Sequence, residues 1–460
     1  MGRTINCFRR KLKINSCVLF TGVFLLTKVY LLYNCIGDDT MAYENNHYVP
    51  RLILKKFDTK KINLYNIKTN EYLPNNELRE SFSENNLYSR ELEEIKLGHE
   101  LESRFGDLLA NKILEAKGQV KLNRKEITLI KKFLLIAQER VPSSPDWNKN
   151  IHAQEERWLE LGYRETKIEN ETDKEYWERT MRVIIESDSL SLDDIVKHPD
   201  VTYVSCIWAC MYNACYLTFL DSSQSKEDFF VTDIGMTCEH EVCKVMKECN
   251  YEEMIKQGYL TCNFFNSKNK SKQSALWKLL NFCKYVEANF YMFSISKNLM
   301  IGLVNPFYRL FSDEDRKDHG LKEPDVCPTK LSKKALMINK RIKKEETNDI
   351  EYVYDIKQLS KKEVVYINCL MLDRIDEWLG FADPNKIIKS LHVYMNIRKT
   401  LKDFSKLKEH LENQGYEFIN KKEIQEFADN FSKNELTEKE KYYIRYLKEK
   451  TKDIEIPFGF

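Results

Sequence analysis

Glycine and proline are scarce in this chain, and so is net charge. The 460 residues include 14 glycines and 10 prolines, the two residues that most often form turns and end helices. Their scarcity indicates a helix-rich protein with few long loops. The 73 lysines and arginines nearly balance 71 aspartates and glutamates. The chain as a whole therefore lacks the positive charge typical of nucleic-acid-binding proteins, although this balance does not exclude a local basic groove.

Several familiar motifs are also missing. The sequence contains no internal repeat, no glycine-rich phosphate-binding loop and no nucleophile elbow. Cysteine is plentiful, but the count of 13 is odd, and a chain of this length does not need a disulfide framework. We expect mostly buried, reduced thiols. Hydrophobic residues make up 42% and charged residues 31%, as in ordinary globular proteins.

Residues 1–40 differ in character from the rest. Basic residues precede an apolar run over residues 16–36, which is long enough for a membrane helix but carries Lys28 near its middle. If the run is a genuine anchor, the protein is a single-pass membrane protein with a cytosolic N-terminus. If translation starts at Met41, residues 1–40 are an over-translated leader and the protein is cytoplasmic. Both alternatives stay open, and a membrane partner follows only from the first.

The most informative stretch is His47-Tyr48-Val49-Pro50-Arg51. Pro50 favours an extended backbone before it, so His47 and Arg51 are expected to project on the same side. Histidine can act as an acid, a base or a metal ligand near neutral pH, and arginine suits carboxylate or phosphate. The structural alternative is a turn-capping histidine and an arginine in an ion pair.

Four helices and two strands are predicted downstream. Apolar periodicity indicates helices from about 90 to 117 and from 124 to 140, the second capped by Asn123 with Glu126 in capping-box position, and the two are expected to form an antiparallel hairpin. The uncharged stretch Val201–Leu220 predicts one buried core helix. Strand-like runs occur at Asp228–Asp233 and Tyr291–Ser296, and a helix is predicted over Val365–Leu379.

One part of the sequence contains several cysteines and a histidine, which are potential zinc ligands. These residues follow closely on one another but lack the paired two-residue spacing of zinc sites, so buried thiols are the preferred interpretation. They are Cys238, His240, Cys243, Cys249 and Cys262.

The run His47 to Arg51, with Leu54 and Phe57 after it, resembles the opening signature of DUF4238, a family of uncharacterised proteins with a domain of unknown function. The resemblance extends from Met41 to about Ala382. The family places a glutamate on the first helix of the hairpin and an arginine at the end of the second. Glu102 and Arg140 match these positions, although Val141 replaces the threonine that follows the arginine in the family.

The family's Thr-Ser-Asp-Asn-Pro segment resembles Thr232-Asp233-Ile234-Gly235, in which the serine, asparagine and proline are missing. Asp233 is the best acidic candidate, and its alternative role is that of a loop aspartate that caps a turn. Ser294, Asn368 and Asp373 correspond more weakly.

The resemblance implies candidate residues but no activity, and two hypotheses follow. The first is a hydrolase acting on a phosphate-bearing or nucleic-acid substrate. His47 would be its acid, base or ligand, Arg51 and Arg140 would hold phosphate, and Glu102 and Asp233 would bind a divalent metal ion. The second is a non-catalytic protein that binds a ligand or partner through the same residues, tethered to a membrane if residues 1–40 are an anchor.

The predicted fold is α+β, predominantly helical, around a small mixed sheet that holds the His47 and Asp233 segments. Three parts are expected along the chain. These are an anchor or leader over residues 1–40, the DUF4238-like domain over residues 41–382, and an appended helical region over residues 383–460.

Overall fold

The computed structural model describes residues 45–85, 87–140, 168–244, 285–304, 351–397 and 402–419, together with residues 424, 425 and 427. All of them belong to one compact unit, Asn45–Phe460. The apolar run over residues 16–36 lies outside this part. Among the helices that are described, none is both long enough and apolar enough to cross a membrane.

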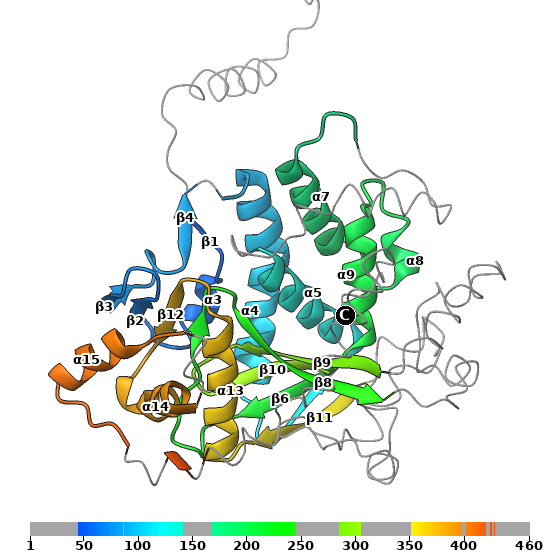
Figure 1. Cartoon of the computed structure of the whole chain (residues 1–460). Coiled ribbons are helices and arrows are strands. Elements are labelled where there is room, and N and C mark those ends of the chain that lie inside the picture. The colour runs from blue at the N-terminus through cyan, green and yellow to red at the C-terminus, as the bar shows by residue number, and fades with distance from the viewer. Residues whose placement is uncertain are drawn as a thin grey trace, which may run out of the picture. The chain divides into compact units, whose positions relative to one another are not determined.

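Three β-sheets organise the described residues (Figure 1). A two-stranded sheet pairs β1 (Asn45–His47) with β4 (Ser83–Asn85). The six-stranded sheet has the order β5 (Gln119–Leu122), β11 (Tyr352–Gln358), β6 (Tyr216–Asp221), β10 (Leu299–Val304), β9 (Tyr285–Ser294) and β8 (Met236–Lys244). The four-stranded sheet has the order β3 (Glu71–Glu77), β2 (Lys61–Asn66), β12 (Trp378–Phe381) and β7 (Val231–Thr232).

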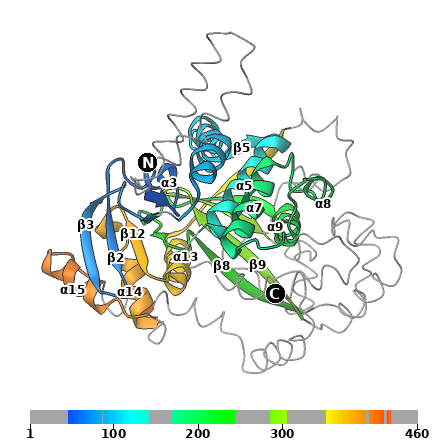
Figure 2. The same cartoon turned by 90° about the horizontal axis from the view of Figure 1, so that it is seen from above.

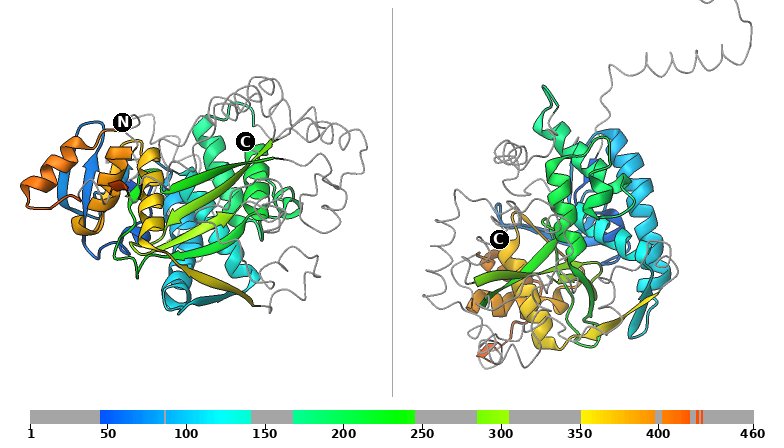
Figure 3. Two further views of the ribbon diagram at one scale, coloured as in Figure 1. Left: turned by 60° about the horizontal axis from the view of Figure 1, so that its bottom comes forward. Right: turned by 90° about the vertical axis from the view of Figure 1, so that its right-hand side faces the viewer.

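The helices occupy both sides of the six-stranded sheet. On one side lie α5 (Arg124–Glu139), α7 (Asp173–Glu186) and α9 (Tyr203–Ala214), which pack against one another, and on the other lies α13 (Lys361–Arg374) (Figures 2 and 3). The shorter or more peripheral helices are α3 (Arg51–Leu54), η1 (Glu91–Ser103), α4 (Arg104–Leu108), η2 (Leu109–Ile113), α8 (Leu192–Ile195), η6 (Pro384–Lys386), α14 (Ile388–Ile397) and α15 (Ser405–Asn413).

The predicted α+β class is confirmed. The six-stranded sheet is mixed, because β11 and β6 pair in parallel while all other neighbouring strands of this sheet pair antiparallel. Strands contribute more than the small sheet expected. Two of the missed strands, β6 and β10, are buried on both faces. In β6, Leu217 and Phe219 join the core beneath α5 and α9, whereas Tyr216 and Leu220 join the core around α13. Such strands read as continuous apolar runs.

This two-sided burial explains two wrong predictions. Val201–Leu220 is not one helix: α9 ends at Ala214, Cys215 is extended with ψ 156°, and β6 follows. Periodicity alone cannot separate a fully buried strand from a buried helix. The helix predicted over Val365–Leu379 ends at Arg374, and its last residues enter β12, where Leu379 and Phe381 are fully buried.

The predicted helical hairpin is present. Asn123 and Glu126 form the expected capping box at the start of α5. The first helix is a continuous run of η1, α4 and η2 with long π-type stretches. Its middle pairs with the C-terminal end of α5 through Glu102 and Arg140, and its C-terminal end pairs with the start of α5 through Lys112 and Glu126. The two helical runs are therefore antiparallel, and Glu102 faces the end of α5.

Candidate functional site

His47 lies at the end of β1 and is buried, with 6% of its surface exposed. Its Nε2 is 3.2 Å from the carbonyl oxygen of Leu78. Because a carbonyl only accepts hydrogen bonds, Nε2 is the nitrogen that carries the proton. Pro50 caps α3, and Arg51 is its first residue. The expectation that His47 and Arg51 share one extended stretch is therefore wrong at Arg51, which is helical and exposed.

The pKa of His47 is lowered to about 4, chiefly by burial and to a smaller extent by the charges of Arg51 and Arg140, against the opposing effect of the hydrogen bond to Leu78. The imidazole is consequently neutral at neutral pH. The same causes show that both arginines are close to the ring.

Arg140 is the central residue of the site. It is the C-cap residue that directly follows α5 and is only 2% exposed. Its Nε donates to the carbonyl of Tyr48 at 3.1 Å, its Nη2 donates to the carbonyl of His47, and its Nη1 pairs with Glu102 Oε1 at 2.5 Å. One guanidinium thus ties the histidine motif, the first helix and α5 together, and its three nitrogens all have protein partners.

Aromatic residues hold the end of α5 that carries Arg140. The Tyr88 hydroxyl donates to the carbonyl of Arg140, and Trp177 Nε1 donates to the carbonyl of Glu139 at 3.1 Å. The two rings stack with centroids 5.3 Å apart. Tyr212 donates to the side chain of Gln138. The sequence does not predict Tyr88 and Tyr212 as part of the site, because nothing in their local sequence indicates these long-range partners.

Asp233 follows β7 and is 4% exposed. Its carboxylate accepts hydrogen bonds from the backbone amides of Asp376, Glu377 and Trp378 at 3.1, 2.5 and 2.9 Å. Burial raises its pKa, and these amides partly oppose the shift. The carboxylate therefore fixes the turn that enters β12, which agrees with the turn-capping alternative, although the turn belongs to a distant segment.

Tyr48 connects Asp233 with the Arg140 cluster. The pKa of the Tyr48 hydroxyl is raised by burial and, to a smaller extent, by the charge of Asp233. The backbone carbonyl of the same residue accepts from Arg140. The structure thus joins His47, Glu102 and Arg140 in one hydrogen-bonded cluster, and the charges of Arg51 and Asp233 act on His47 and Tyr48 of the same motif.

Metal ligation finds no support in the described part of the chain, where no group of three or more histidine, cysteine, aspartate or glutamate residues is arranged to hold a metal ion. Cys238 is buried in β8. Cys243 also belongs to β8. Cys249 and Cys262 lie outside the described residues.

The weaker matches to the family have structural partners. Ser294 Oγ lies 3.6 Å from the sulfur of Met371. Asn368 is fully buried in α13, and its Nδ2 donates to the carbonyl of Asp228 at 2.8 Å and to Ser390 Oγ at 3.0 Å. Asp373 is only partly buried. None of the three joins the Arg140 cluster through an observed contact.

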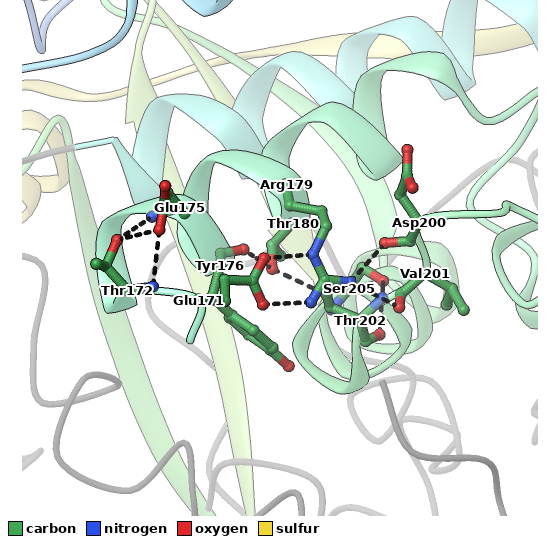
Figure 4. Close-up of polar contacts among 10 residues, drawn as sticks. All are labelled: Glu171, Thr172, Glu175, Tyr176, Arg179, Thr180, Asp200, Val201, Thr202 and Ser205. Atoms are coloured by element: carbon green, nitrogen blue, oxygen red, sulfur yellow. Dashed lines mark hydrogen bonds and ion pairs between the residues drawn. The ribbon is translucent and has the colours of Figure 1, made fainter. Parts of the chain in front are cut away.

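A second buried arginine uses its guanidinium in the same way as Arg140 (Figure 4). Arg179 on α7 forms two hydrogen bonds of 2.6 Å with the carboxylate of Glu171, and its Nη1 donates to the carbonyls of Asp200 and Val201 at 3.0 and 3.2 Å. This group joins the chain before α7 to the chain before α9. It matches no predicted functional residue, so it serves as an internal example of a structural arginine.

Comparison with known proteins yields one match. Residues 45–385 match a family model described as "Protein of unknown function (DUF4238)". No curated protein and no solved structure matches the chain.

Replacing Arg140 by methionine should destabilise the fold strongly. The change leaves the Glu102 carboxylate and the two motif carbonyls without their donor, and breaking a buried ion pair from one side costs about 3–5 kcal/mol. Urea unfolding measures this loss. Lys112→Met breaks the more exposed pair with Glu126 and is the matched control, with an expected loss below about 1 kcal/mol. Equal losses in the two variants would contradict the role given to Arg140.

His47 should make the fold sensitive to acid. Its pKa is about 4 in the folded chain and 6.5 as a free side chain, so the unfolded chain binds the proton more tightly. The stability that this neutral imidazole contributes above pH 6.5 is lost as the pH falls towards 4, by up to about 3 kcal/mol. The difference in unfolding free energy between wild type and His47→Gln, measured at several pH values, isolates this contribution. A difference that does not change with pH would refute it.

Proposed function

For this chain, which belongs to the DUF4238 family of proteins of unknown function, we propose that the motif from His47 to Arg51 is a binding site for an anionic ligand and not a catalytic centre. In this proposal Arg140, Glu102 and Asp233 form a buried framework, and Arg51 is the residue that meets the ligand. One observation carries the proposal. The buried candidate residues are hydrogen-bonded to other parts of the protein, whereas Arg51 is exposed to solvent.

Arg140 supports this division because each of its guanidinium nitrogens already donates to the protein. Because the side chain is only 2% exposed, a phosphate could reach it only if the contacts with the backbone of His47 and Tyr48 opened. Asp233 supports it in the same way, since three backbone amides already occupy its carboxylate. Binding a divalent cation there would release the turn that enters β12. Such internally satisfied polar networks are typical of groups that specify a structure.

Arg51 differs from both residues because it is exposed. It is attached to a segment whose position is fixed by buried neighbours, since Val49 is 3% and Leu54 0% exposed. A guanidinium on a rigid segment can form paired hydrogen bonds with a carboxylate or phosphate at a smaller entropic cost than one on a loose loop. The neutral imidazole of His47 lies close to it without adding a competing negative charge.

A hydrolase is the second candidate function, favoured by Arg140, which contacts both Glu102 and the backbone of His47. Against it stands the pKa of His47, which is about 4. A general base works best with a pKa near the working pH, so this imidazole is a weak base at pH 7. The absence of a suitable ligand group among the described residues likewise gives no support to a metal-dependent mechanism.

Arg51→Ala should weaken the binding of ATP, or of inorganic pyrophosphate, about tenfold or more without changing the melting temperature noticeably, because a charge-assisted pair with a phosphate is lost and no buried contact changes. Isothermal titration calorimetry and thermal unfolding measure the two effects. Lys117→Ala is the matched control, since Lys117 is an exposed cation on a different segment.

Unchanged binding in Arg51→Ala would refute the proposed contact. Release of phosphate by wild type, abolished in a folded His47→Gln variant, would instead establish the hydrolase. The two candidate functions therefore give different results in the same set of proteins.

A further inference from the structure

The segment that begins with Arg51 is the most basic part of the site. Residues 51–61 contain one carboxylate, Asp58, and five cations, in a chain whose cations and anions otherwise nearly balance. The five cations are Arg51, Lys55, Lys56, Lys60 and Lys61.

The fold sorts this segment into an apolar inside and a basic outside. Leu54 and Phe57 are 0% and 2% exposed and anchor the segment to the core. Lys56 is half-buried, and the other four cations of the segment are exposed. The turn therefore presents its cations to solvent while its apolar side chains hold it in place.

Asp58 does not cancel these charges through ion pairs with them. Its Oδ1 accepts from the backbone amides of Lys60 and Lys61 at 2.9 and 3.2 Å, which closes the turn. These amides, that of Lys60 most strongly, and to a smaller extent the charge of Lys297 lower the pKa of Asp58. The carboxylate thus has a structural role that fixes where the lysines project.

A sixth cation comes from a distant part of the chain. Lys297 lies in the turn between β9 and β10, is exposed, and donates its backbone amide to the carbonyl of Lys56 at 3.5 Å. This contact sets the β9–β10 turn beside the basic segment. We call the six residues the basic strip: Arg51, Lys55, Lys56, Lys60, Lys61 and Lys297.

We propose that the basic strip binds the phosphate backbone of a nucleic-acid strand, with several phosphates contacted at once. This inference rests on the proposed anion site at Arg51 and names its ligand class. A single phosphate or carboxylate would need only Arg51 and one neighbour, whereas a group of six cations from two chain segments fits a polymer of negative charges.

The surroundings of the strip define the mode of binding. Phe57, the one aromatic residue in the segment, is buried, so bases have no ring there on which to stack. Binding is therefore directed at the backbone and independent of sequence. An anionic membrane fits less well, because the large exposed hydrophobic residues of the described chain are Leu114, Ile168 and Val196, and none lies in the strip.

The test compares fluorescently labelled oligothymidylates of about 4 and about 16 nucleotides, lengths that span the usual range of small single-strand sites. The longer strand should bind at least tenfold more tightly. The logarithm of its affinity should fall linearly with the logarithm of the salt concentration between about 50 and about 200 mM. In a Lys55→Gln/Lys60→Gln variant the magnitude of that slope should fall by about 1.4, because each lost phosphate contact contributes about 0.7 for single strands.

A Lys117→Gln/Lys121→Gln variant removes two exposed lysines from another surface and should keep the wild-type slope. Equal slopes in the two double variants would overturn the proposal. So would equal affinity for the two lengths, or tight binding of inorganic polyphosphate with no binding of the oligonucleotides.

If Arg51→Ala abolishes ATP binding but the length of the oligonucleotide has no effect on affinity, this inference fails while the anion site stands. If Arg51→Ala leaves ATP binding intact, the anion site itself fails.

Discussion

The buried guanidinium of Arg140 is the interaction on which the arrangement of the site depends. A charge that is 2% exposed is stable only with close partners. Glu102 supplies the opposite charge, and the backbone carbonyls of His47 and Tyr48 accept the remaining donors. The arginine can lie there only if three distant segments meet at the end of α5. The position of the histidine motif is therefore a consequence of satisfying one charge.

The remaining site follows from that constraint. Once β1 is held against α5, Pro50 starts α3 and turns Arg51 to the surface. On the other side Asp233 binds the amides that lead into β12, which connects the site to the four-stranded sheet. A buried framework with an exposed basic edge is the result. This arrangement suits a protein that presents a fixed surface to a charged ligand.

The sequence predicted the features that depend on local chemistry. The capping box of Asn123 and Glu126 and the helical periodicity around it were sufficient to place α5. The strand β6 could not be placed, because burial on both faces removes its alternation. Arg140 and Glu102 were recognised as a pair of interest, but their role depends on carbonyls far away in the chain. No local pattern indicates whether an arginine faces a ligand or its own backbone.

The central claim is that Arg51 meets the ligand and Arg140 does not. Nuclear magnetic resonance of the arginine Nε–H groups during titration with ATP tests it directly, with Arg179 as a second buried reference. We expect the Arg51 signal to move with saturation, while the Arg140 and Arg179 signals stay in place and exchange slowly with solvent. A moving Arg140 signal beside an unchanged Arg51 signal would contradict the account and place the ligand inside the cluster.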